Sequence, residues 1–180
     1  MDKEKFLELK QKVVDAGYGD EIAWQEGVSL CHNADDFFRE YMWVVVSAGM
    51  KNQIARKIEN RIYEAIDKGL PISTAFRHKG KVAAIEYVKQ HRHQVFAQYL
   101  ASTNSLEFFA TLPWIGHITK YHLAKNLGLD TVKPDRHLVR IASTYGIEPG
   151  QMCRQLAEQT GCRIGTIDIV IWRAANLGFI

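Results

Sequence analysis

Apolar residues recur along this chain at the spacing of α-helices almost from end to end. Segment 3–16 places Phe6 and Val13 on one face, and segment 54–66 repeats isoleucine every fourth residue. Segment 33–46 is apolar on nearly every side, which predicts a buried central helix. Its β-branched residues also suit a strand, but no other stretch offers such a strand a partner. The pattern therefore predicts an all-α fold.

Helix starts and stops place the remaining elements. Segments 81–90 and 91–100 are read as two consecutive helices, and further helices are expected over 149–160 and 164–177. Large aromatic side chains are usually buried, so most of the tryptophans, Trp24 among them, are expected to pack in the core; for Trp24 the alternative is a place in a binding cleft.

Residues 104–128 predict two helices joined by a tight hairpin. Pro113 ends the first helix, since proline cannot continue the hydrogen-bond ladder. Gly116 stands where we expect the turn to need a residue without a Cβ. The second helix begins near His117 and stops at Gly128. Backbone N–H groups at its start would point outward, which makes the hairpin a candidate phosphate-binding site that reads no base sequence.

A candidate catalytic carboxylate follows the hairpin. Asp135 comes after Pro134 and precedes the apolar-periodic run 138–142, which is the position of a helix N-cap. N–H donors and the helix dipole keep a carboxylate there ionised and fixed in space. Asp135 alone could be a plain N-cap. Its spacing from the hairpin and its DRH context favour a catalytic role.

These two features together resemble the helix-hairpin-helix plus Gly/Pro…Asp signature of the base-excision DNA glycosylases. The segment LPWIGHITKYHLAKNLG is followed by DRHLVRIA. Trp114 departs from the pattern where the first hairpin glycine is usual, and it is expected to be the most exposed of the tryptophans. Arg136 departs where Thr or Val is usual. The matching positions are Leu112, Pro113, Ile115, Gly116, Asp135, His137 and Arg140.

The resemblance implies a two-lobed helical fold with the active-site cleft between the lobes. It implies an enzyme that flips a damaged or modified base out of duplex DNA and hydrolyses its N-glycosidic bond. Asp135 would stabilise the positive charge that develops on the sugar and orient a water. The candidate DNA contacts in and after the hairpin are Pro113, Trp114, Gly116, His117, Thr119, Lys120 and His137.

A second candidate DNA contact lies earlier in the chain. The segment KNQIARKI is similar to a stretch of the 8-oxoguanine branch of the family, where a loop enters the minor groove and fills the gap left by the extruded base. Carried over, Lys51, Asn52 and Gln53 form this wedge segment; the alternative is a polar turn between helices. A basic cluster over 77–81, which includes Lys81, is read as solvated surface, with phosphate contact as the alternative.

Lysine placement bears on the reaction type. Bifunctional members of the family carry a lysine two residues after the second hairpin glycine, and here that position is Ile118. Lys120 projects from a different side of the helix. The resemblance therefore predicts a glycosylase without AP lyase activity, in which Lys120 contacts a phosphate. A displaced lysine nucleophile is the alternative.

Composition narrows the setting. The chain has 180 residues, a net charge of +3 and three cysteines, Cys31, Cys153 and Cys162, without the paired spacing of a zinc ribbon or a disulfide framework. It cannot build the four-cysteine iron–sulfur cluster of some family members. We expect no cofactor and no metal, although a monovalent cation at the hairpin is compatible with the resemblance. The N-terminal helix is amphipathic and no signal peptide.

These observations predict that residues 1–180 form one compact domain and that the protein is a monomer. We expect it to bind double-stranded DNA in the cytoplasm and not to bind a membrane. Two other classes stay open. One is a non-catalytic helix-hairpin-helix DNA-binding protein, and the other is a base-modifying enzyme on the glycosylase scaffold. Base release from lesion-bearing duplexes separates the first, and a requirement for a co-substrate separates the second.

Overall fold

The computed structural model describes residues 1–180, and every regular element in it is helical. The prediction of an all-α fold is therefore confirmed. Segment 33–46 forms helix α3 (Ala34–Ser47), not a strand. The Asn33 side chain begins this helix as its N-cap by accepting a hydrogen bond from the N–H of Asp36, which satisfies one of the groups that a helix start leaves free.

The chain folds into two compact units. The terminal unit comprises Met1–Leu30 and Ala124–Ile180, and the central unit comprises Cys31–Leu123. Helix α7 (Thr119–Asn126) begins in the central unit and ends in the terminal unit. The expectation of a single domain stays a prediction.

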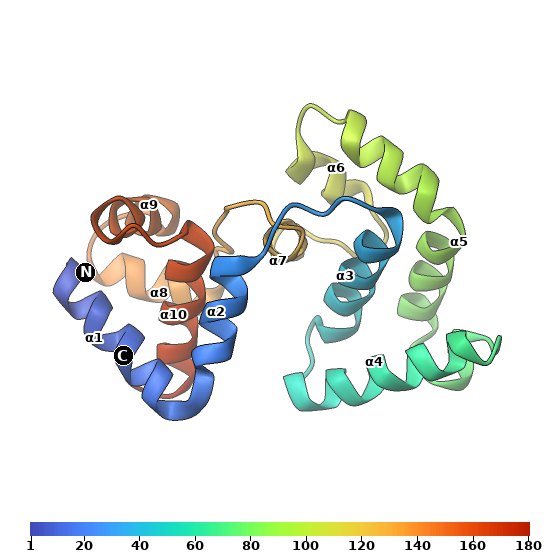
Figure 1. Ribbon diagram of the computed structural model, residues 1–180, viewed down its shortest axis with the longest axis horizontal. Helices are drawn as coiled ribbons and strands as arrows, with labels where there is room; N and C mark the ends of the chain where they lie inside the picture. Colours follow the sequence, from blue (N-terminus) through green and yellow to red (C-terminus); the bar gives the residue numbers. More distant parts are fainter. The chain divides into compact units, whose positions relative to one another are not determined.

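Helix α10 (Ile164–Asn176) lies at the centre of the terminal unit and packs against α1, α2, α8 and α9 (Figure 1). Its Ile167 and Val170 are buried among apolar residues of these helices. A π-helical turn, Val14–Tyr18, joins α1 to α2 and is kinked at Gly17. The surrounding helices are α1 (Lys3–Val13), α2 (Gly19–Gly27), α8 (Arg136–Thr144) and α9 (Pro149–Thr160).

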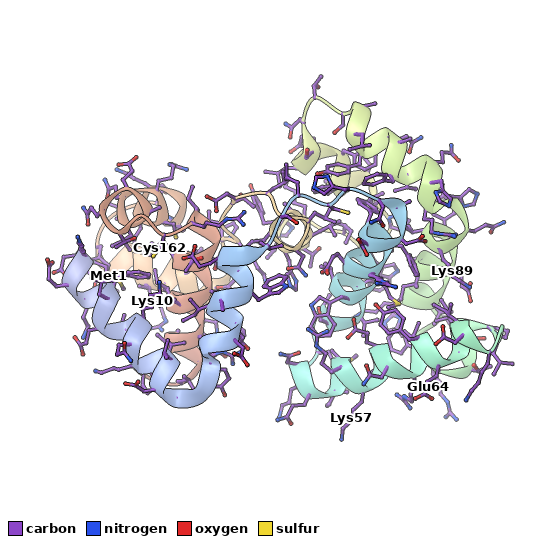
Figure 2. All side chains as sticks on the ribbon, viewed as in Figure 1. Met1, Lys10, Lys57, Glu64, Lys89 and Cys162 are labelled. Carbon is purple, nitrogen blue, oxygen red and sulfur yellow. The ribbon has the colours of Figure 1, made fainter.

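Polar contacts in the terminal unit join segments that are far apart in the sequence. Lys10 of α1 lies beside Cys162, which precedes α10, and its Nζ donates to Sγ at 3.4 Å (Figure 2). All three cysteines are free thiols.

Helix α3 lies at the core of the central unit and packs against α4 and α5 (Figure 1). The ring centroid of its Phe37 lies 5.9 Å from that of Phe96 and 6.3 Å from that of Phe109. This aromatic cluster attaches the first helix of the hairpin to α3. The other elements of the unit are α4 (Asn52–Asp67), a 3₁₀ turn (Ile72–Thr74), α5 (Lys79–Ala101) and α6 (Ser105–Thr111).

Two predictions about individual elements are wrong. Segments 81–90 and 91–100 form the single helix α5, because the polar residues between them include none that stops a helix. No tryptophan is buried, and Trp24 is 45% exposed because α2 turns Ile22 and Gln25 inward instead. No helix combines the length and the apolar character needed to cross a membrane.

Candidate functional site

The hairpin between α6 and α7 spans residues 112–118 and is fastened from one side. Leu112 and Ile115 are buried, and the Ile115 N–H donates to the Leu112 carbonyl at 3.1 Å. The hydroxyl of Tyr41, on α3, donates to the carbonyl of Pro113 at 2.7 Å. Tyr41 is fully buried, and burial raises the pKa of its phenol, which therefore stays a donor. The predicted end of the first helix before Pro113 is confirmed.

Trp114 occupies the strained position of the hairpin. It is the one non-glycine residue with a positive φ, +62°, a conformation that costs an L-residue about 1–2 kcal/mol. This is the position where the family pattern has glycine. The indole meets the ring of His78 edge-on, with centroids 4.9 Å apart. A Cβ on Gly80 would come within 2.7 Å of the indole, so Gly80 leaves the room that it occupies.

Gly116 plays a different role from the one predicted. Its φ lies outside the left-handed region, and a Cβ there would meet only the Thr119 hydroxyl oxygen, at 3.9 Å. The expectation that the turn needs a glycine at this position is wrong, because the backbone strain falls on Trp114. A small residue at 116 leaves the backbone uncovered.

The start of α7 is the part of the hairpin that is open to an anion. Gly116 and His117 are exposed, and the Gly116 N–H donates to Thr119 Oγ1 at 2.7 Å. The first N–H groups of a helix have no partner within the helix, and the dipole favours negative charge there. Lys120, on the first turn, is already paired: its Nζ donates to Glu107 Oε1 at 2.8 Å, and this hydrogen bond raises the pKa of Lys120.

The wedge segment Lys51–Gln53 is exposed and forms the start of α4. The turn ahead of it is held by Lys81, whose Nζ donates to the carbonyl of Ala48 at 2.7 Å and to that of Val46 at 3.2 Å. Lys81 is 5% exposed, and burial lowers its pKa. The interpretation of Lys81 as solvated surface is therefore wrong.

Asp135 is the N-cap of α8, as predicted. Its Oδ1 accepts hydrogen bonds from the N–H groups of His137, at 2.9 Å, and Leu138, at 3.1 Å. The second carboxylate oxygen, Oδ2, takes part in neither bond. Asp135 and His137 are both half-buried. The carboxylate is thus fixed through one oxygen and has the other available.

The structure gathers the predicted site residues into three groups. The hairpin holds Pro113, Trp114 and Gly116 together with His117, Thr119 and Lys120, and the wedge segment lies in the same central unit. Asp135 and His137 lie in the terminal unit. The predicted cleft stays a prediction. No cluster of three or more His, Cys, Asp or Glu side chains could hold a metal ion.

Sequence reasoning missed a buried charged pair close to Asp135. Lys125 Nζ lies 2.8 Å from Asp168 Oδ2, and the two residues are 7% and 2% exposed. The signal was the charge of Asp168 inside an otherwise apolar stretch of α10. Lys133 lies two residues before Asp135. Burial lowers the pKa of Lys133, and the negative charge of Asp135 offsets only part of this shift.

Comparison with known proteins identifies a fold. No protein-family model matches the chain, and neither does any curated protein. Among solved structures, the Methanocaldococcus jannaschii 8-oxoguanine glycosylase/lyase, in complex with a 15mer DNA containing 8-oxoguanine, aligns with a TM-score of 0.63. The alignment covers 95% of this chain and 96% of that chain at 16% sequence identity. The chain therefore has the fold of a helix-hairpin-helix glycosylase along nearly its whole length.

Proposed function

We propose that this protein is a DNA glycosylase that acts as a monomer on double-stranded DNA and hydrolyses the N-glycosidic bond of a damaged or modified base. One observation carries the proposal. Asp135 caps α8 through a single oxygen and follows an open-backbone hairpin, in the order that the glycosylase signature requires. The fold match to a glycosylase over 95% of the chain supports it.

Each group would make one contribution to the reaction. The exposed backbone at the start of α7 binds a phosphate, and the wedge segment occupies the gap in the duplex while the target nucleotide is turned out. As the base leaves with the bonding electron pair, positive charge develops on the sugar and Asp135 stabilises it. The free Oδ2 also accepts a proton from the water that attacks C1′.

We propose that the reaction ends at base removal, without strand cleavage. Ile118 stands where the family's bifunctional members carry a lysine. Lys120 is held by Glu107, and its raised pKa keeps the amine protonated, which makes it a poor nucleophile. The lyase activity in the name of the Methanocaldococcus protein belongs to that protein.

The deciding experiment is Asp135→Asn, assayed on duplexes that each carry one of a panel of damaged bases. Asparagine is as good an N-cap as aspartate, so the free energy of unfolding should change by less than about 1 kcal/mol. The rate of base release should fall by about 10²- to 10⁴-fold, while binding to the duplex persists. Asp20→Asn, an exposed carboxylate in the same unit, should leave the rate unchanged.

The outcomes separate the other classes. A wild-type protein that binds the duplexes and releases no base would be a non-catalytic DNA-binding protein, with Asp135 as a plain cap. Activity that appears only with an added co-substrate would indicate base modification. The wild-type product should be an intact abasic strand that breaks in alkali. A borohydride-trapped adduct would instead show an amine nucleophile, and mapping it would distinguish Lys120 from Lys133.

A further inference from the structure

The buried pair Lys125–Asp168 has a third member. Asp168 Oδ2 accepts a hydrogen bond from the Lys125 ammonium at 2.8 Å. The same oxygen also accepts a hydrogen bond from the backbone N–H of Lys133 at 2.9 Å. A buried ion pair is weak evidence of a stabilising role, because desolvation cancels much of the attraction. Stability alone therefore does not explain why charged residues are buried at this position.

An explanation lies in the segment that the pair contacts. Residues 127–135, the connector, have no regular secondary structure and end at Asp135. The start of α10 and the residue before it hold the connector at successive points. Arg163 donates to the Gly128 carbonyl at 2.8 Å, and the Gly165 N–H donates to Asp130 Oδ1 at 3.0 Å. Asp168 adds the last of these points, nearest to Asp135.

The short path from Lys133 to Asp135 has little freedom. Lys133 precedes Pro134, which restricts the backbone of both residues. The Asp135 N–H donates to the Lys133 carbonyl at 2.7 Å. Fixing the Lys133 N–H therefore fixes the point from which the Asp135 side chain starts.

We propose that Asp168 is a positioning residue for the Asp135 carboxylate, and that Lys125 holds the Asp168 side chain in place. This inference rests on the proposed function and assigns a role to residues that touch no substrate. A misplacement of about 1 Å at a reacting group costs about 100-fold in rate. A charged acceptor bonded from two sides holds its geometry better than a single neutral hydrogen bond.

Close packing around the trio supports a fixed geometry. Gln25 is fully buried against Gly165, where a Cβ would come within 2.6 Å of its amide nitrogen and 3.3 Å of Lys125 Cγ. The glycine thus lets Gln25 and the Lys125 stem close over the start of α10.

Two double variants test the proposal. Lys125→Met with Asp168→Leu removes both charges and the acceptor for the Lys133 N–H. Lys125→Met with Asp168→Asn removes both charges and keeps an oxygen acceptor. Replacing a buried ion pair by apolar residues of similar volume is often neutral for stability, so the leucine variant should fold. The asparagine variant, which is also uncharged and keeps an acceptor for the Lys133 N–H, should fold as well. Their folded fractions are measured by thermal unfolding before the rates are compared.

The rate of base release is measured in single turnovers with enzyme in excess, and duplex affinity is measured separately. The leucine variant should release base about 10- to 100-fold more slowly than wild type at unchanged affinity. The asparagine variant should recover most of that loss. Arg173→Met with Glu21→Gln breaks the other ion pair of α10, which does not touch the connector, and should leave the rate unchanged.

Amide hydrogen exchange at Lys133 gives a readout that needs no activity. Its N–H should be protected in wild type and in the asparagine variant, and exchange faster in the leucine variant. A folded leucine variant with wild-type rate and wild-type protection would overturn the positioning role while leaving the glycosylase proposal intact. Absence of base release from wild type, with the exchange pattern as expected, would count against the proposed function alone.

Discussion

The hairpin and the connector are both short irregular segments, but the fold holds them by opposite means. The hairpin is anchored from one side by Leu112, Ile115 and the Tyr41 hydroxyl, and its outer backbone is bare. Polar and charged groups hydrogen-bond to the connector at several points along its length, and one of these groups, Asp168, is buried. A phosphate is bound by exposed N–H groups, whereas a catalytic carboxylate needs one fixed position.

Two glycines show the difference in detail. A Cβ on Gly116 would meet only the Thr119 hydroxyl oxygen, at an ordinary contact distance of 3.9 Å. A Cβ on Gly128 would lie 2.2 Å from the carbonyl oxygen of Ser29, and Gly128 also has a φ of +87°. The glycine of the hairpin thus keeps a surface accessible, while the glycine of the connector permits close packing of two backbones.

The largest expected effect comes from Gly128→Ala. The methyl group collides with backbone, which cannot move aside as a side chain can, and the left-handed φ adds strain. We expect a loss of at least about 3 kcal/mol in the free energy of unfolding, measured by urea denaturation. Gly116→Ala is the matched control and should stay within about 0.5 kcal/mol of wild type. Equal losses in both variants would erase the contrast between the two segments.

Tyr41→Phe should have the next largest effect, on the hairpin's anchor. It removes the hydrogen bond to Pro113 and leaves a carbonyl without its donor, at a cost of about 1–2 kcal/mol in the free energy of unfolding. Tyr87→Phe, on an exposed tyrosine of α5, should cost little. A neutral result at Tyr41 would mean that the apolar contacts alone fix the hairpin.

The pH dependence of stability, compared between wild type and Tyr41→Phe, gives a second test of the buried phenol. Burial raises the pKa of Tyr41 above its ordinary value of 10.0, so the folded protein keeps a proton that the unfolded chain releases. The phenol's contribution to the free energy of unfolding is fully present below pH 10. As the pH rises above 10, this contribution is lost by about 1.4 kcal/mol per pH unit. Wild type should therefore lose stability between pH 10 and 11 more steeply than Tyr41→Phe. Parallel curves would contradict a buried, protonated phenol.

Gly116→Val tests the bare surface of the hairpin. A Cβ at this position meets only the Thr119 hydroxyl oxygen, at 3.9 Å, so we expect normal folding. The added side chain covers the backbone next to the N–H groups of α7 and should weaken duplex binding about 5- to 10-fold for all sequences alike, since phosphate contacts carry no base information. Fluorescence anisotropy with two unrelated duplexes measures this. Unchanged affinity would remove the hairpin as the phosphate anchor.

Local sequence signals predicted most of the fold. Pro113 as a stop and Asp135 as the cap of α8 were both readable, because each acts on backbone within a few residues. The hairpin and its order relative to Asp135 follow from the same local rules. Such signals do not reveal which half of a turn bears the strain, so the role of Gly116 was misjudged.

The buried cations were beyond those local rules. Lys81 bonds carbonyls 33 and 35 residues away along the chain, and Lys125 pairs with a carboxylate 43 residues away. A single sequence shows these lysines only as surface-like residues, because their partners come together through tertiary packing. The elements that position the candidate site were therefore harder to predict than the site residues themselves.

The smallest expected effect is a gain in binding at the hairpin. Glu107 places a carboxylate beside the proposed phosphate-binding surface and forms an ion pair with Lys120. Glu107→Gln should release this cation and remove a repulsive charge, which would tighten duplex binding about 2- to 4-fold at low salt and have no effect at high salt. Glu64→Gln makes the same change in net charge at an exposed side chain of α4 and should have a smaller effect. Equal gains in affinity for Glu107→Gln and Glu64→Gln would show a general charge effect. If adding Lys120→Gln to Glu107→Gln abolishes the gain in affinity, the gain comes from the freed lysine.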